Sequence, residues 1–213
     1  MWDFIVERKA QILINAFNHA YLVVLCVLFA TVIGVALAVL VTRFPKTEPV
    51  ANAMSAIGLT IPSFALIGLL LPVTSLGDVT ALVAVTFYAV LPILRNAVVG
   101  LQGVDANLLE SARGMGMSEP MSLVRVRLPL AWPVILAGVR VSLQMSMGIA
   151  AIAAYVLGPG LGVMIFTGLA QIGGKNSLNY AVTGTVGIVI IALLLDLVLL
   201  VIGRATTSKG IRV

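Results

Sequence analysis

Groups that could carry out chemistry are scarce in this sequence, and few of them lie near one another. His19 is the only histidine and Cys26 the only cysteine, so a metal site or an internal disulfide is not expected, and nucleophilic catalysis lacks its usual base. The pattern Gly-x-x-x-x-Gly-Lys-Ser/Thr, which cradles nucleotide phosphates, does not occur. The sequence therefore predicts a chain that is not an enzyme and that binds no cofactor of its own.

One polar stretch, Glu110 to Pro129, combines residues that form helices with residues that end them. A short helix is predicted from Asn107 to Arg113, and Gly114 and Gly116 allow a sharp reversal after it because glycine tolerates positive φ angles. Ser118 is then suited to cap a second short helix. The predicted module is a helix, a glycine turn and another short helix.

The second short helix is expected to carry an apolar ridge. Glu119 and Pro120 suit its first turn, while Pro129 and Pro133 mark the return of the chain to the next long helix. The residues of the ridge are Met121, Leu123 and Val124. Such a ridge either docks on a partner protein or lies against lipid, and the residue types alone leave both interpretations open.

Composition places most of the 213 residues in a lipid environment, because 61% are hydrophobic and only 10% are charged, whereas soluble domains carry about 25% charged residues. A helix that spans a bilayer needs about 20 mostly apolar residues. The segments that meet or nearly meet this requirement are Ala20 to Val41, Asn52 to Val73, Val79 to Leu101, Pro133 to Leu157 and Ala181 to Gly203. The expected fold is an all-α membrane protein with five transmembrane helices, which form a single domain over residues 1–213.

Two further segments are expected to lie outside the spans. Residues 1–19 are predicted to form an amphipathic helix at the membrane surface, with apolar residues toward lipid and charged residues toward water. The apolar set is Trp2, Phe4 and Ile5, and the charged set is Glu7, Arg8 and Lys9. Residues 96–132 form the longest stretch between two spans and contain the module described above. A loop of this length usually has a function or is disordered, and its mixture of helix formers and breakers favours a function.

Basic residues divide unequally between the two sides that five spans define. Of the 13 Lys and Arg residues, three fall on the side of the N-terminus, namely Arg8, Lys9 and Lys175. The other ten are Arg43, Lys46, Arg95, Arg113, Arg125, Arg127, Arg140, Arg204, Lys209 and Arg212. Because positively charged segments stay in the cytoplasm, the N-terminus is predicted outside, and residues 96–132 and the C-terminus inside. The same distribution accounts for the net charge of +5 without nucleic acid as a partner.

Arg140 and Asp196 are charged residues inside predicted spans. They lie at similar depth, about 9 to 12 Å from the inner ends of their helices, and either charge would be costly in lipid without a partner. We therefore expect the two side chains to contact each other directly or to share a polar network with Gln144, one turn beyond Arg140. The alternative is that Asp196 contacts a cationic substrate.

The stretch that contains the module resembles the cytoplasmic signature of ABC importer permeases, which is written Glu-Ala-Ala, then Gly, then Ile-x-Leu-Pro. Glu110 is followed six residues later by Gly116, and Leu128-Pro129 stands at the family spacing. Two positions depart from the signature: Ser111 replaces the first Ala, and Val126 replaces the Ile.

Most of the chain is similar to one subfamily, the permeases for osmoprotectants such as glycine betaine, choline and carnitine. The similar segments are Thr60 to Ser63, Tyr88 to Asn96, Ala112 to Met117 and Gly160 to Phe166. Pro159 departs from the subfamily, which has a small residue and Gly at this point, and it stiffens the stretch Gly158 to Gly160.

This resemblance implies that the chain is the permease subunit of an ATP-driven importer in the bacterial cytoplasmic membrane. Two ATP-binding subunits, which hold ATP and Mg, would dock beneath two permease subunits (a homodimer or a heterodimer). A separate protein would bind the substrate, since the chain stops at Val213. The residues implied in the ATPase contact are Glu110, Ser111, Ala112, Arg113, Gly116, Met117, Ser118, Met121, Leu123, Val124, Leu128 and Pro129. Gly116 and Pro129 would supply turns at the two ends of the docked helix.

A quaternary amine substrate would favour aromatic faces over full counter-charges. The candidates are Phe64, Phe87, Tyr88 and Tyr155, each of which could instead face lipid or serve packing. Two other hypotheses stay open: a permease for another small solute such as an amino acid, and a secondary transporter or channel that works without an ATPase. The second of these would favour paired inverted repeats or discontinuous helices.

Overall fold

The computed structural model describes residues 1–207, and every regular element within this range is helical. In chain order the α-helices are α1 (Trp2–Arg43), α2 (Glu48–Thr60), α3 (Ser63–Thr74), α4 (Asp78–Gln102), α5 (Ala106–Gly114), α6 (Glu119–Ser122), α7 (Leu128–Ala153), α8 (Gly162–Ala170) and α9 (Ser177–Thr206). Short 3₁₀ turns cover Pro45–Thr47 and Ala154–Val156, and a π-helical turn covers Leu123–Arg127. Lys209 and Arg212, two residues of the predicted inner basic set, lie outside the described residues.

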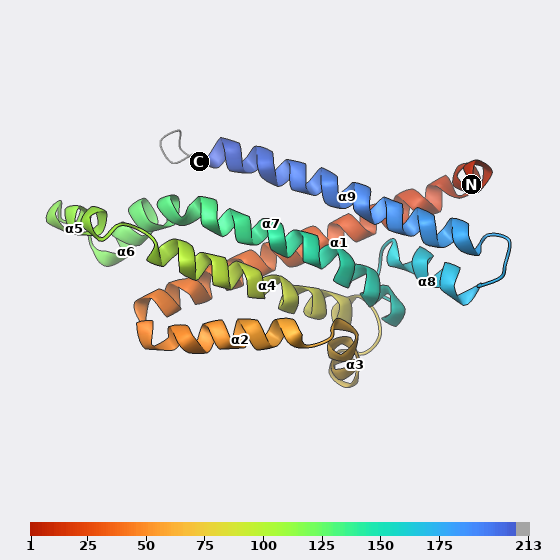
Figure 1. Ribbon diagram of the computed structural model, residues 1–213, viewed down its shortest axis with the longest axis horizontal. Helices are drawn as coiled ribbons and strands as arrows, with labels where there is room; N and C mark the ends of the chain where they lie inside the picture. The colour runs from red at the N-terminus through yellow and green to blue at the C-terminus, as the bar shows by residue number, and fades with distance from the viewer. Residues whose placement is uncertain (208–213) are drawn as a thin grey trace.

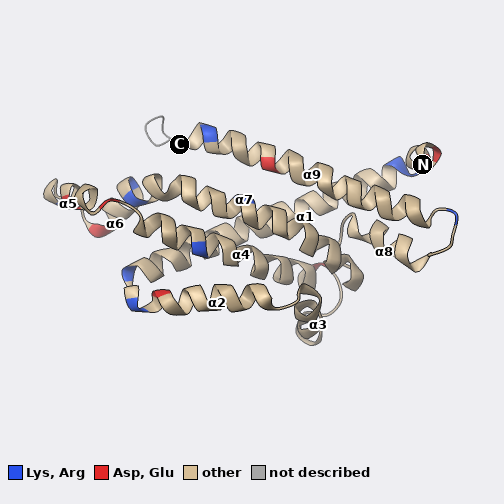
Figure 2. Ribbon diagram, in the orientation of Figure 1, with Lys and Arg blue, Asp and Glu red and all other residues tan. Residues whose placement is uncertain are grey.

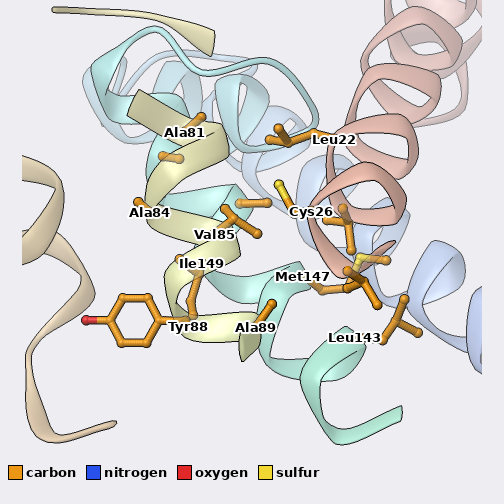
Figure 3. Close-up of a cluster of buried hydrophobic side chains, with 14 of the residues drawn as sticks. Leu22, Cys26, Ala81, Ala84, Val85, Tyr88, Ala89, Leu143, Met147 and Ile149 are labelled. Atoms are coloured by element: carbon orange, nitrogen blue, oxygen red, sulfur yellow. The ribbon is translucent and has the colours of Figure 1, made fainter. Parts of the chain in front are cut away.

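The core forms where α4 packs against α1 and α7 (Figure 1). Cys26 of α1, Val85 of α4 and Met147 of α7 belong to one buried cluster, which Figure 3 shows in close-up. Cys26 is fully buried and packs in the core as a small apolar residue.

Small residues bring the three core helices close together. A Cβ atom added to Gly34 of α1 would lie 2.9 Å from the Cγ2 atom of Ile93 in α4. One added to Gly138 of α7 would lie 2.6 Å from the Cβ atom of Asn96 in α4 and 3.1 Å from the Pro92 carbonyl oxygen. Because lipid is as apolar as the helices, close packing of this kind, rather than burial from water, holds membrane helices together.

In the described part of the chain, 4 helices are long and apolar enough to cross a membrane: α1, α4, α9 and the continuous helix Glu119–Val156 that contains α6 and α7. The predicted second span is not one helix, because α2 and α3 meet at an angle of 97°. The span predicted from Asn52 to Val73 therefore consists of two helices that meet at an angle. The number of candidate spans reaches 5 only if the bent pair is counted as one.

Pro62 accounts for the break between α2 and α3. Proline disfavours helical geometry in the residue before it, and Ile61 is extended, with a ψ angle of 125°. The Tyr88 hydroxyl of α4 donates a hydrogen bond of 2.6 Å to the carbonyl oxygen of Ile61. Since a freed backbone carbonyl in lipid needs a partner, Tyr88 stabilises the break at this position.

The N-terminal segment differs from the prediction. α1 runs without interruption for 42 residues, about 63 Å, so the predicted boundary between a surface helix over residues 1–19 and a span from Ala20 is wrong. Phe4 does not face lipid: it is buried, and its ring lies edge-on to that of Tyr180 in α9, with 4.8 Å between centroids. Arg8 does not simply face water, because its guanidinium lies 4.9 Å from the Tyr180 ring centroid. Tyr180 of α9 thus takes the place of lipid beside Phe4 and of water beside Arg8.

Helix α6 continues into α7. The π turn between them keeps helical geometry, and the Leu128 N–H donates to the carbonyl of Leu123, five residues back. The predicted turn at Pro129 is therefore wrong. Pro129 lies in the first turn of α7, directly after the wider π turn, where its missing N–H breaks no regular α-helical ladder.

The two ends of the molecule differ in charge. Figure 1 shows α5 and α6 at one end, beside the C-terminal end of α9 and the loop between α1 and α2. The N-terminus and α8 lie at the opposite end. Lys and Arg gather mainly at the α5 and α6 end (Figure 2). The loops that were predicted to lie on the inner side, together with the last turns of α9, therefore lie at one end of the bundle.

Close packing at Gly138 generates a stability prediction. Gly138→Ala should destabilise the protein by about 1 to 3 kcal/mol, because the added methyl meets Asn96 and the Pro92 backbone, which cannot move aside. Gly148 is the matched control in the same helix, since a Cβ there meets nothing within 4 Å, and Gly148→Ala should be neutral or slightly stabilising. Midpoints of thermal unfolding in detergent measure both. Equal midpoints for the two variants would contradict the packing assignment.

Candidate functional site

Helix α5 and the reversal after it form as predicted. The Asp105 carboxylate caps α5 by accepting a hydrogen bond of 2.9 Å from the Asn107 N–H. Gly116 has a φ angle of +82°, and the Met117 N–H donates to the carbonyl of Ala112 across the turn at 3.1 Å. Only glycine takes this φ angle without strain, so the reversal depends on Gly116.

Helix α6 begins after Ser118, as expected, with Pro120 in its first turn. The Ser118 side chain makes no capping hydrogen bond. Across the reversal, Nη2 of Arg113 lies 3.9 Å from Oε1 of Glu119. Both side chains are largely exposed, so this ion pair contributes little to stability, although it joins α5 to α6.

The predicted ridge is only partly exposed. Met121 and Val124 are 42% and 62% exposed, but Leu123 packs against the buried cluster formed by α1, α4 and α7. Leu123 therefore anchors the segment rather than extending the ridge. Of the other residues implied in the ATPase contact, Ala112 is buried, Met117 and Leu128 are half-buried, and Glu110, Ser111, Arg113, Gly116, Ser118 and Pro129 are exposed.

Met115 extends the exposed apolar surface and was not among the predicted residues. It lies in the glycine reversal and is 71% exposed. An apolar residue between Gly114 and Gly116 was the available signal, since a turn at the polar end of the molecule gives such a side chain no core to enter. The exposed surface thus differs from the predicted ridge, because it includes Met115 and lacks Leu123. From here on, the apolar ridge means Met115, Met121 and Val124.

Arg140 of α7 and Asp196 of α9 make the direct contact that their depth predicted. The Arg140 Nε and Nη2 atoms donate to Oδ1 and Oδ2 of Asp196, each at 2.8 Å. The two parallel bonds match the guanidinium fork to the carboxylate plane. Because the exposed fractions are 34% and 18%, the pair lies at the side of the bundle, where it attaches α9 to α7.

The four candidate aromatic residues fall into two groups. Tyr88 is buried and bonds to Ile61, and its ring lies edge-on to that of Phe87 at 5.3 Å. Phe64, at the start of α3, and Tyr155, just after α7, are both more than half exposed, and their ring centroids lie 4.9 Å apart. Phe166 of α8 joins them, with its ring 5.4 Å from that of Tyr155. We call Phe64, Tyr155 and Phe166 the aromatic cluster.

Phe166 is a residue that sequence reasoning missed. It lies in α8, a helix within the stretch between the last two predicted spans for which no helix was predicted. The signal was present, because Phe166 stands in a short apolar run between Gly162 and Gly168. Direct packing of α8 against the 3₁₀ turn Ala154–Val156 brings that run to Tyr155.

Comparison with known proteins identifies relatives over the whole chain. The family described as "Binding-protein-dependent transport system inner membrane component" matches residues 30–208. The glycine betaine/carnitine/choline transport system permease protein OpuCB of Bacillus subtilis is 36% identical over 212 residues, which cover 100% of this chain and 96% of that protein. The osmoprotectant import permease protein OsmW of Salmonella typhimurium is 35% identical and covers 98% of each chain.

Solved structures show the same fold. A chain of the MetNI methionine ABC transporter, in an inward-facing conformation, superposes with a TM-score of 0.83. It is 25% identical in sequence, and the match covers 95% of this chain and 99% of that chain.

The Arg140–Asp196 pair generates a prediction of its own. Asp196→Asn should lower the stability by about 1 to 2 kcal/mol, because Arg140 would keep its charge and lose the carboxylate that offsets it. Thermal unfolding in detergent measures the change, with Gln144→Ala, one turn away on α7, as the control expected to have little effect. If the midpoint of Asp196→Asn equals that of the unaltered protein, the pair does not hold α9 in place.

Proposed function

The chain belongs to the family of binding-protein-dependent transport system inner membrane components, and on this premise we propose that it is the permease subunit of an ATP-driven importer for a small osmoprotectant. The substrate class is supported by relatives named for glycine betaine, carnitine and choline, which match 98% or more of this chain. On this proposal the protein carries a quaternary amine across the bacterial cytoplasmic membrane.

The apolar ridge is the docking surface for the ATPase in this proposal. Met115, Met121 and Val124 are exposed at the end of the molecule where most basic residues gather (Figure 2). Apolar side chains in that position gain free energy by entering a groove on another protein. This exposed ridge, carried by the segment that matches the importer signature, is the observation that supports the docking role most strongly.

Helix continuity suggests how movement of the ATPase reaches the rest of the permease. The segment Glu119–Val156 is a single helical rod of 38 residues, about 57 Å long. A displacement of α6 therefore moves α7 as well, with no turn at Pro129 to absorb it. The rod ends at the aromatic cluster, because Tyr155 belongs to its last turn.

The aromatic cluster is the proposed contact for a cationic substrate. Phe64 and Tyr155 present exposed ring faces close together, and such faces attract a quaternary ammonium without a full counter-charge. Phe64 follows the Pro62 break directly, so a movement of α7 against α3 would change the distance between the two rings. Asp196 is already bonded to Arg140, which favours pairing over the alternative of a substrate contact.

The remaining parts of the proposal concern the assembly. Two ATPase subunits, a second permease subunit and a separate substrate-binding protein complete the importer, with ATP and Mg held by the ATPase. The N-terminus faces outward, and the α5 and α6 end faces the cytoplasm. An amino acid is the second candidate substrate, because the structural relative is a methionine transporter.

Reconstituted transport tests this proposal. Liposomes that contain the permease, its ATPase and its binding protein should take up glycine betaine, choline or carnitine when ATP is supplied, and should not take up methionine. Met121→Asp should abolish uptake and co-purification of the ATPase, since a charge in the docking groove lacks a partner. Met121→Leu is the matched control and should retain both.

Two results would contradict the proposal. Uptake by the unaltered permease without the ATPase would favour a secondary transporter or a channel. Normal co-purification of the ATPase with Met121→Asp would remove the ridge as the docking surface.

A further inference from the structure

A cavity of about 450 Å³ lies beside the C-terminal end of α1 and just before the N-terminal end of α7. Its lining comes from the last turns of α1, from α5, from α6 and from the π turn. Arg43 is the last residue of α1, and Arg127 is the last residue before α7. The cavity therefore lies at the level where membrane-spanning segments give way to polar ones, whichever side of the membrane this end faces.

The charge in the cavity is not balanced. Arg43, Arg113 and Arg127 line it together with one carboxylate, that of Glu119. Glu119 already lies 3.9 Å from Arg113. Among the described residues, no carboxylate forms an ion pair with Arg43 or Arg127. Two arginines that have no ion-pair partner among the described residues thus line a cavity with room for an anion, and the guanidinium of Arg43 lies 6.0 Å from the ring centroid of Phe44.

Most of the remaining lining is apolar, and Thr42 and Ser122 are its two uncharged polar residues. Val39 of α1, Leu109 of α5 and Leu123 of the π turn contribute to the wall. A hydrated inorganic anion gains nothing from such a wall, whereas the glycerol and first methylenes of a lipid bury apolar surface against it. The combination of cationic and apolar lining at a membrane boundary therefore favours a lipid over a free anion.

We propose that this cavity binds the headgroup of an anionic phospholipid, with the phosphate between Arg43 and Arg127 and the glycerol against Val39. Guanidinium groups bind phosphate oxygens through paired hydrogen bonds, and basic pockets between membrane helices bind anionic headgroups. The bound lipid links the end of α1 to α6 and the π turn, and so steadies the segment that carries the apolar ridge. The binding itself requires no ATPase.

Native mass spectrometry of the detergent-purified chain tests the proposal with lipids of matched acyl chains. Phosphatidylglycerol should bind at least about tenfold more tightly than phosphatidylcholine. The double variant Arg43→Gln/Arg127→Gln should lose this preference. Arg95→Gln, which removes an exposed charge of α4 outside the cavity, should keep it. Inorganic phosphate at millimolar concentration should not displace phosphatidylglycerol.

Glu119→Gln controls for the possibility that the double variant loses lipid binding only because it is misfolded. Its expected effect on the preference for phosphatidylglycerol over phosphatidylcholine is opposite to that of the double variant. Removing the one carboxylate of the lining should increase the preference for phosphatidylglycerol, and an unfolded variant cannot show such a gain. Equal binding of the two lipids, a preference retained by the double variant, displacement by phosphate, or no gain in Glu119→Gln would each overturn the proposal. None of these results bears on docking of the ATPase, which Met121→Asp tests separately.

Discussion

The backbone stays helical between Ser122 and Leu128, because the π turn Leu123–Arg127 connects α6 to α7 without a break. The signature proline, Pro129, therefore does not divide α6 from α7. One rod carries Met121 and Val124 near one end and Tyr155 at the other. The half of the rod that lies in the bundle packs against α4 through contacts that leave no room for an added methyl group at Gly138. On the proposed function, a displacement of Met121 and Val124 is therefore a displacement of the rod.

Two neighbours of the rod are attached to it differently. α9 is joined to it by the paired hydrogen bonds of Arg140 and Asp196. α3 is separated from α2 by the extended Ile61–Pro62 step, and the Tyr88 hydroxyl ties that step to α4 rather than to the rod. The aromatic cluster joins a residue of the rod, Tyr155, to a residue of α3, Phe64. On the proposed function, a movement of the rod against α3 would therefore change the distance between these two rings, where a cationic substrate is proposed to bind.

Much of this arrangement could be predicted from the sequence, for identifiable reasons. The apolar segments predicted most of the spans. Arg140 and Asp196 were expected to pair because either charge alone would be costly in lipid. Gly116 was expected to allow the reversal because glycine tolerates a positive φ angle. What could not be predicted depends on partners distant in sequence. Pro62 interrupts its span, and the break is stabilised because the Tyr88 hydroxyl donates a hydrogen bond to the freed Ile61 carbonyl. Pro129 interrupts nothing because a π turn precedes it. Phe4 and Arg8 turn toward Tyr180, which lies 176 residues after Phe4 in the chain.

The distance across the rod tests the central claim most directly. In a Cys26→Ala background, spin labels at Ser118→Cys and Gly148→Cys span 30 residues, about 45 Å along a straight helix. Double electron–electron resonance in the assembled importer measures this distance with and without trapped ATP. The labelled chain is diluted with unlabelled chain so that each complex holds one labelled permease. A rigid rod predicts one narrow distribution that is the same in both states. A distance that shortens by more than about 5 Å in either state, as a bend of about 60° at Pro129 would produce, would contradict the account.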